Sequence, residues 1–260
     1  MCTAFFYFNQ KKTPHSLTLV FNRDEFYQRI TKPLHCWSPH KNIFAGQDLK
    51  SKGTWLGVNK KGDFAFLTNY RNPNLTKEGL ESRGVLIPRF LNSSMTPFEF
   101  LEELCQHPNA FNPYNLILGT LHPNIGLYYY SNIENKIKKL EEGFHALSNG
   151  LLNTPWPKVK DGLKIFKNLV EEEKGDEEFF TFMKNNHKAH INDLPKTGID
   201  LKQEHLLSSL FIKSKTYGTV TTSFLKFCHS DRKVSFSEVN HRDTIHDKKS
   251  LHFFIETSSS

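Results

Sequence analysis

The sequence predicts an α+β fold with extensive antiparallel sheet, formed by one domain over residues 1–260. Short apolar or alternating segments, bounded by Gly, Pro and Asn, recur near both ends of the chain and are typical of strands. Helical spacing and capping residues occur in the segments between them. No internal repeat or Pro/Ser-rich linker divides the chain, so strands and helices are expected to share one fold.

The first predicted elements are two neighbouring strands at the N-terminus. Residues 3–8 are rich in aromatic side chains, residues 9–15 form a polar turn, and residues 16–21 form the second strand. A hairpin folded about position 12 places residue 2 opposite residue 22. Cys2 is therefore expected beside the segment from Asn22 to Glu25.

Helices are expected in the middle of the chain. Thr96 is a helix N-cap, Pro97 occupies the first helical position and Glu99 completes a capping box. The apolar face of this helix would contain Phe98, Leu101, Leu104 and Cys105, which places Cys105 in the core. Further helices are expected at residues 86–91, 159–170 and 177–186.

Other strands are expected on both sides of these helices. Residues 60–62 form a hairpin turn between two of them, and residues 257–260 form a flexible tail. The predicted strands cover residues 42–46, 54–59, 63–68, 114–121, 125–130, 144–148, 210–213, 219–227, 234–238 and 251–255.

The composition favours a soluble, cytoplasmic protein with an anionic small-molecule partner. The formal net charge is +7, but the lysines are scattered and residues 171–178 are acidic, so no nucleic-acid partner is expected. Four widely spaced cysteines fit free thiols in a reducing compartment, and His187 with His190 alone makes no metal site. No apolar run has the length of a membrane span.

Cys2 is the leading candidate for a reactive residue. Removal of Met1 would leave a thiol and a free α-amine on this residue, with ordinary pKa values of about 8.5 and ~7.7–8.0. The amine could then act as the base for its own thiol. Arg23 would favour the thiolate, and Asp24 or Glu25 could hold Arg23 or the ammonium group. A small buried structural cysteine is the alternative interpretation.

A set of short motifs distributed along the chain resembles the NRDE family, the family of the transport-and-Golgi-organisation proteins. The central motif is Asn22-Arg23-Asp24-Glu25, about twenty residues after Met1-Cys2. The other matching motifs, in order, are Gly53–Gly57, Leu67–Arg71, Ser82–Gly84, Leu147–Leu151, Thr154–Trp156 and Tyr217–Thr219.

This resemblance implies a fold and a set of site residues. The family is similar to N-terminal-nucleophile hydrolases such as penicillin V acylases and bile-salt hydrolases, which implies a four-layer αββα sandwich. Cys2 would be the nucleophile and Arg23 its charged neighbour. Asp24 would belong to the catalytic group, with Asp24 or Glu25 as the acid, while Asn69 and Asn149 would lie near the oxyanion.

The chain departs from the pattern of its relatives at one position. Many relatives have an arginine after Tyr217-Gly218-Thr219, where this chain has Val220. The hydrolases also use a late arginine near the thiolate, so Val220 weakens the expectation of hydrolysis. Arg83 and Arg89 remain as alternatives for a replacement in space.

Two functions are therefore expected around one pocket. The first is binding of an amphipathic anionic metabolite, since the family implies roles in haem trafficking and acyl-coenzyme A or lipid homeostasis. Cys2 could ligate haem iron, and no cofactor is required. The second is a cysteine-dependent amidohydrolase or thioesterase. Transient membrane contact is compatible with both, and the expected ligand-binding residues are Asn22, Arg23, Asp24, Glu25, Trp55, Tyr70 and Arg71.

Overall fold

The computed structural model describes residues 1–10, 16–37, 42–242 and 248–256. Its strands form two antiparallel sheets. Sheet A contains, in order, β10 (Gly143–Leu147), β1 (Cys2–Phe8), β2 (Leu17–Phe26), β11 (Tyr217–Cys228), β12 (Lys233–Asn240) and β13 (Lys248–Phe254). Sheet B contains β3 (Thr31–Cys36), β4 (Ile43–Asp48), β5 (Leu56–Asn59), β6 (Asp63–Asn69), β7 (Tyr114–Thr120), β8 (Gly126–Ser131) and β9 (Lys136–Lys139).

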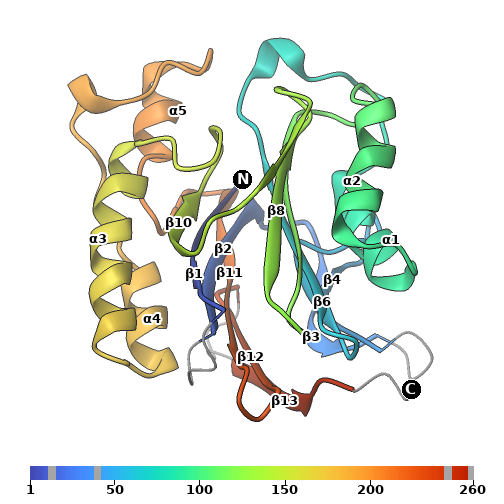
Figure 1. Ribbon diagram of the computed structural model, residues 1–260. Coiled ribbons are helices and arrows are strands. Elements are labelled where there is room, and N and C mark those ends of the chain that lie inside the picture. Colours follow the sequence, from blue (N-terminus) through green and yellow to red (C-terminus); the bar gives the residue numbers. More distant parts are fainter. Residues whose placement is uncertain (11–15, 38–41, 243–247, 257–260) are drawn as a thin grey trace.

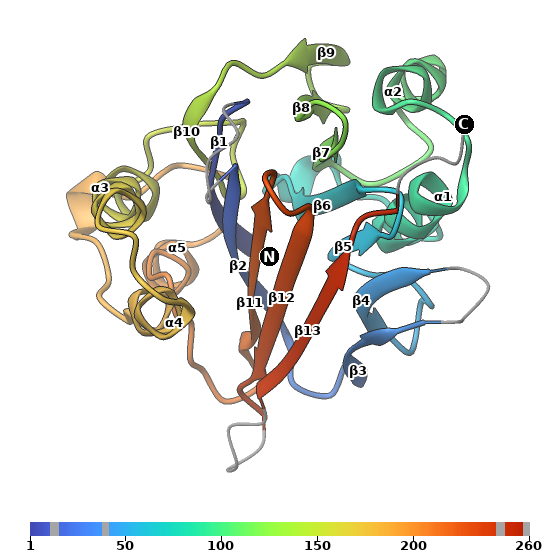
Figure 2. The same ribbon diagram turned by 60° about the horizontal axis from the view of Figure 1, so that its bottom comes forward.

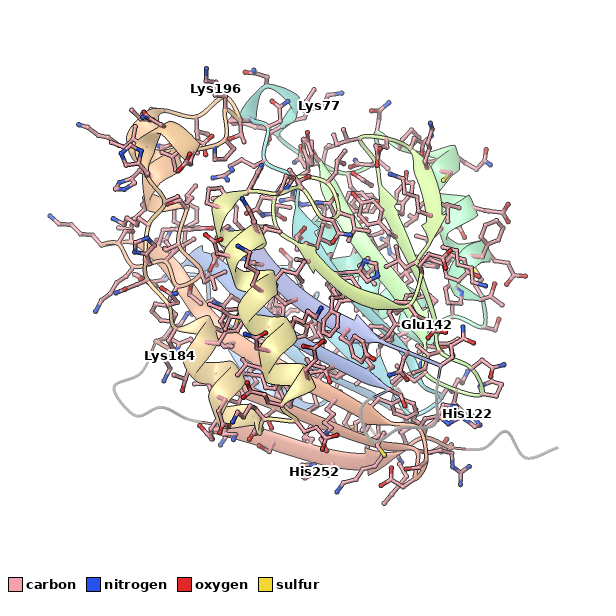
Figure 3. The ribbon with its side chains drawn as sticks, turned by 60° about the vertical axis from the view of Figure 1, so that its left-hand side comes forward. Lys77, His122, Glu142, Lys184, Lys196 and His252 are labelled. Carbon is pink, nitrogen blue, oxygen red and sulfur yellow. The ribbon has the colours of Figure 1, made fainter. Side chains whose placement is uncertain are left out.

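The two sheets face each other between two layers of helices (Figures 1 and 2). Helices α3 (Pro157–Glu171) and α4 (Asp176–Met183) cover the outer face of sheet A, and both lie across its strands in Figure 3. On the other side, α1 (Leu86–Asn92) and α2 (Pro97–Gln106) cover sheet B. The short helix α5 (Leu201–Leu206) lies on the side of α3. The expected αββα arrangement is confirmed.

Strand alternation on β1 explains how one strand supplies two cores. Cys2, Ala4 and Phe6 belong to the core between the sheets, whereas Phe5 belongs to the core beneath α3 and α4. Phe5 packs so tightly that a Cβ atom on Gly162 of α3 would overlap its ring. Both faces of β1 are therefore buried, which explains why residues 3–8 read as a continuous apolar run.

Two edge strands, β3 and β9, and helix α5 were not expected from the sequence. β3 contains Pro33 and a register shift between Lys32 and His35, and β9 is the four-residue segment Lys136–Lys139 with mostly exposed side chains. Charged residues, Pro and irregular pairing are typical of strands at sheet edges. They interrupt the alternation of apolar and polar residues by which a strand is recognised in a sequence.

Two sequence predictions are wrong in detail. Residues 210–213 do not form a strand of either sheet, because the backbone N–H of Phe211 donates to Asn185 and that of Ile212 donates to the hydroxyl of Thr219. On α2, Phe98 is 43% exposed and Phe100 is buried instead. Cys105 is only partly buried against the core of sheet B.

The rest of the expected secondary structure is present with small changes in bounds. The capping box of Thr96 and Glu99 is formed, and the turn at residues 60–62 joins β5 to β6. The turn at residues 11–15 and the tail at 257–260 lie outside the described residues. None of the described helices has the length and apolar character needed to cross a bilayer.

A buried carboxyl group connects the two sheets near their edges. Glu238 of β12 is 1% exposed and accepts hydrogen bonds from the backbone N–H of Leu34 in β3 (3.0 Å) and from Ser223 Oγ in β11 (3.1 Å). Burial raises the pKa of Glu238 from 4.5 to about 7, because the charged form loses its hydration. Ionisation of this group therefore opposes folding.

This pKa shift predicts a pH-dependent effect of the Glu238→Gln substitution. The folded protein holds the Glu238 proton more tightly than the unfolded chain, so the free energy of unfolding falls as pH rises from 4.5 through 7. The glutamine oxygen can accept from the N–H of Leu34, and its NH2 group can donate to Ser223 Oγ, so both contacts are made without the charge. We expect Glu238→Gln to be more stable than wild type by about 3 kcal/mol near pH 8 and by much less near pH 5, measured by urea unfolding.

The exposed Glu102→Gln is the matched control and should show no such pH dependence. Equal stability differences for Glu238→Gln at the two pH values would contradict the assignment of the raised pKa to this group.

Candidate functional site around Cys2

The β1–β2 pairing brings the N-terminus to the Asn22–Glu25 segment. Cys2 pairs with Arg23, one residue from the position expected from the sequence. The ammonium of Met1 donates to the carbonyl of Asp24 (2.5 Å), and the N–H of Asp24 donates to the carbonyl of Met1 (2.6 Å). Cys2 and Arg23 therefore form the adjacent non-hydrogen-bonded pair, in which the side chains of opposite strands lie closest.

The same alternation divides the Asn22–Glu25 segment between two faces of sheet A. Arg23 lies on the face of Cys2 and forms an ion pair with Glu25 (3.6 Å). Asn22 is fully buried on the opposite face, where its amide donates to the carbonyls of Met183 and Leu210. The structure therefore places Asn22 outside the pocket of Cys2, where it holds the end of α4 against the sheet.

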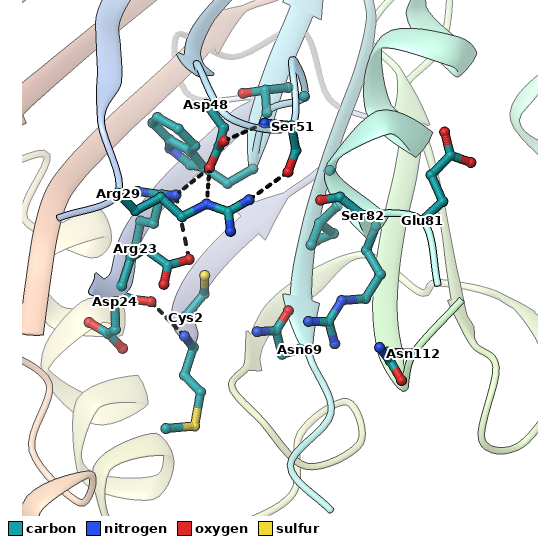
Figure 4. Close-up of a pocket in the computed structure, with 18 of the residues that line it drawn as sticks. Cys2, Arg23, Asp24, Arg29, Asp48, Ser51, Asn69, Glu81, Ser82 and Asn112 are labelled. Atoms are coloured by element: carbon teal, nitrogen blue, oxygen red, sulfur yellow. Dashed lines mark hydrogen bonds and ion pairs between the residues drawn. The ribbon is translucent and has the colours of Figure 1, made fainter. Parts of the chain in front are cut away.

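A pocket of about 360 Å³ lies beside Cys2 (Figure 4). It gathers five of the residues expected from the sequence in addition to Cys2, and several that were not expected. The expected residues that line it are Arg23, Asp24, Glu25, Trp55 and Asn69. Arg83, one of the two arginines considered as a replacement for the late arginine, also lines the pocket. The further lining residues include Met1, Arg29, Asp48, Ser51, Leu67, Leu80, Glu81, Ser82 and Asn112.

Asp48 holds two arginines in this pocket. Its Oδ2 accepts from Arg23 Nη2 (3.0 Å) and from Arg29 Nε (2.6 Å), while Oδ1 accepts from the backbone N–H groups of Lys50 and Ser51. Burial alone would raise the pKa of Asp48, but these hydrogen bonds and the two positive charges lower it. The Arg23 guanidinium also lies 4.5 Å above the ring of Trp55, so its position is tightly defined.

Arg83 adds a third arginine to the pocket. Its Nη1 donates to the backbone carbonyl of Pro113 (2.7 Å), a neutral partner, unlike the carboxylate shared by Arg23 and Arg29. Burial lowers the pKa of Arg83, while the field of Cys2 opposes that change. A Cβ atom on Gly53 would overlap the backbone of Gly84, so these two glycines allow the loop of Arg83 to approach the pocket.

This geometry decides between the two arginines considered as replacements at the site. Arg89 forms an exposed ion pair with Glu81, whereas Arg83 lines the pocket with Cys2. Val220 is fully buried at an irregularity of β11 and does not line the pocket. Arg83 therefore supplies a positive charge to the site from sheet B's side of the pocket.

The Cys2 thiol is largely shielded from water, with 6% of the residue exposed. Burial raises the pKa of this thiol, and the positive charges of the N-terminus and Arg23 only partly offset the effect. The Met1 ammonium that supplies this charge also donates to Tyr217 Oη (2.7 Å). With Met1 in place, the thiol is therefore kept in its protonated form near neutral pH.

The carboxyl of Asp24 does not contact Arg23. Its Oδ1 accepts from Thr219 Oγ1 (2.7 Å), and burial raises the pKa of Asp24. Lys158 lies in the same buried region, where burial lowers its pKa from 10.5 to about 8. Neither Thr219 nor Lys158 was identified from the sequence as part of the site.

The remaining expected residues line a second hollow. Tyr70, Arg71 and Asn149 lie along a groove separate from the Cys2 pocket. The Asn149 amide donates to the backbone carbonyl of Asn69 (2.9 Å), so it supports Asn69 rather than pointing to Cys2. Asn69 is thus the amide from the expected pair that lines the Cys2 pocket.

Comparison with known proteins identifies relatives over most of the chain. A family model described as Transport and Golgi organisation 2 matches residues 1–243. The human Transport and Golgi organization protein 2 homolog is 31% identical over 256 residues, which cover 92% of each chain. The homolog from Bos taurus is 36% identical over 180 residues, which cover 66% of this chain and 65% of that relative.

Solved structures give a weaker similarity. The Cys2→Ala mutant of conjugated bile acid hydrolase from Clostridium perfringens superimposes with a TM-score of 0.48 at 9% identity, over 96% of this chain and 92% of that one. The family assignment rests on the sequence matches, which extend from the Cys2 segment past the end of β12. This chain belongs to the Transport and Golgi organisation 2 family.

Proposed function

We propose that this protein binds an amphipathic anionic acyl metabolite, of the acyl-coenzyme A class, with the acyl carbonyl beside Cys2. The observation that carries the proposal is the convergence of Cys2, Asn69 and Arg83 on one pocket of about 360 Å³. A volume of roughly 300–1,000 Å³ is usual for small-molecule sites. The Asn69 amide and the Arg83 guanidinium are hydrogen-bond donors that suit a carbonyl oxygen and an anionic group.

The state of the Cys2 thiol favours an acyl ligand over haem. A cysteine ligates iron as the thiolate, and with Met1 in place burial raises the pKa of Cys2, so iron would first have to displace the thiol proton. A neutral thiol can pack against an acyl group without losing a proton. Haem, the other cargo expected from the sequence, is therefore the less favoured ligand.

The proposed binding function predicts an effect of substituting Arg83. Arg83 bonds to a neutral carbonyl, whereas Arg23 and Arg29 are both paired with Asp48, so the charge of Arg83 is available to an anionic ligand. We expect Arg83→Gln to raise the dissociation constant for octanoyl-coenzyme A about tenfold. Isothermal titration calorimetry would measure it. The exposed Arg89→Gln is the matched control and should bind like wild type. Equal affinities of Arg83→Gln and wild type would refute this assignment.

A haem titration tests the competing ligand. Because the thiol is expected to stay protonated, wild type and Cys2→Ala should give the same haem absorption spectrum at neutral pH. A thiolate-type Soret band that disappears in Cys2→Ala would show that haem iron binds Cys2, and the acyl proposal would then lose its main argument against haem.

Hydrolysis of the acyl ligand is a second candidate function, favoured by the position of Arg83 in the Cys2 pocket. This arginine provides the positive charge that Val220 does not. After Met1 removal, the Cys2 amine would accept the thiol proton and Sγ would attack the acyl carbonyl. The bond to the leaving thiol or amine would break as that group takes the proton. Water would then release the acid from the acyl-cysteine, with Asn69 donating to the oxyanion.

Intact-mass and turnover measurements test this candidate together. This candidate requires the isolated protein to lack Met1 and to release free coenzyme A from octanoyl-coenzyme A. Turnover should be lost in Cys2→Ala and unchanged in Cys36→Ala, which alters an exposed cysteine. Retention of Met1, or stoichiometric binding without product, would exclude hydrolysis and leave the binding function.

A further inference from the structure

The second groove, on the other side of Asn69, has its own chemistry. It has a volume of about 560 Å³ and is lined by Tyr70, Arg71 and Asn149 on one wall. The segments 72–74 and 195–198 form its rim, and Gly198 lies against Pro73 there. Figure 3 shows Lys196 at this end of the molecule.

Arg71 is held rigidly in this groove. Its guanidinium lies 4.6 Å above the ring of Trp156, and its backbone N–H donates to the carbonyl of Asn149 (2.8 Å). Its Nη1 forms an ion pair with Glu204 (3.3 Å), and Thr197 holds the other carboxylate oxygen through its N–H and hydroxyl. A buried arginine fixed in this way loses little entropy when it binds a ligand.

The donors of Arg71 are not fully used. The side chain is 6% exposed, and neither Nε nor Nη1 has a hydrogen-bond partner with good geometry within the described structure. Buried polar groups without hydrogen bonds are costly, which makes their presence informative about function. A ligand with several acceptor oxygens would satisfy such donors.

The charges that line the two hollows differ. The Cys2 pocket is lined by Arg23, Arg29 and Arg83 and by the acidic residues Glu25, Asp48 and Glu81, while the carboxyl of Asp24 is held by Thr219. The charged residues lining the second groove are Arg71 and Lys196, and no described lining residue carries a carboxylate. Glu204, which does not line the groove, neutralises the charge of Arg71. The charge of Lys196 then leaves the groove with a net positive charge.

We propose that this groove is an anion subsite for a phosphate-bearing group, held by Arg71 and Lys196. Arginine presents a planar fork to phosphate oxygens and lysine adds a point charge, so together they favour a group with several charged oxygens over a single carboxylate. The inference extends the proposed function, because a phosphate-bearing acyl carrier could occupy both hollows, but the subsite does not require the acyl group.

Pyrophosphate tests this subsite without filling the acyl site. We expect saturable quenching of tryptophan fluorescence by pyrophosphate, lost in Trp156→Phe because this ring lies under Arg71. Lys196→Ala should raise the dissociation constant at least about threefold, and Arg71→Lys about tenfold. Lys184 is exposed, does not line the groove and lies far from Lys196 in Figure 3, so Lys184→Ala is the matched control and should bind like wild type.

The outcomes separate this inference from the proposed function. Pyrophosphate binding that survives in Arg83→Gln supports the groove even if octanoyl-coenzyme A does not bind near Cys2. Malonate, a dicarboxylate, is titrated for comparison with pyrophosphate. A dissociation constant for malonate equal to or lower than that for pyrophosphate would overturn the preference for phosphate. No saturable pyrophosphate binding, or equal dissociation constants in Lys196→Ala and wild type, would overturn the subsite itself. Because Lys196 is exposed, its substitution is not expected to prevent folding.

Discussion

The antiparallel pairing of β1 with β2 is the constraint on which the rest of the site depends. It brings the chain's first residues into sheet A and places Cys2 opposite Arg23. Strand alternation then directs Cys2 and Arg23 to the space between the sheets, while Asn22 points toward α4. A shift of one residue in this register would exchange the faces of one strand relative to the other and separate Cys2 from Arg23.

Buried charges are concentrated around this pairing, and each is held by a specific partner. Asp48 from β4 contacts Arg23 and Arg29, and Glu204 from α5 contacts Arg71. Burial of such groups costs free energy that the ion pairs only partly recover, so packed apolar residues would stabilise the fold at least as well. Both ion pairs lie at a hollow, since Asp48 lines the Cys2 pocket and Arg71 lines the second groove.

The four-layer arrangement defines how the two hollows are related. Asn69 ends β6 and reaches the Cys2 pocket, while the next two residues, Tyr70 and Arg71, line the second groove. The hydrogen bond from the Asn149 side chain to the carbonyl of Asn69 fixes the backbone at the point where the chain passes from one hollow to the other.

Local sequence by itself determined the N-terminal hairpin, the capped helix at Thr96 and the position of Cys2 beside the Asn22–Glu25 segment, because these features depend on nearby residues and strand or helix periodicity. It did not determine the partners that come from sheet B. Asp48 reaches the pocket only when the two sheets pack, and no short-range pattern marks it. Arg83 belongs to a motif seen in the sequence, but only the packed structure places it, and not Arg89, beside Cys2. The tertiary structure also decided that Tyr70, Arg71 and Asn149 lie in a separate groove, because the wall opposite them comes from a distant segment of the chain, residues 195–198.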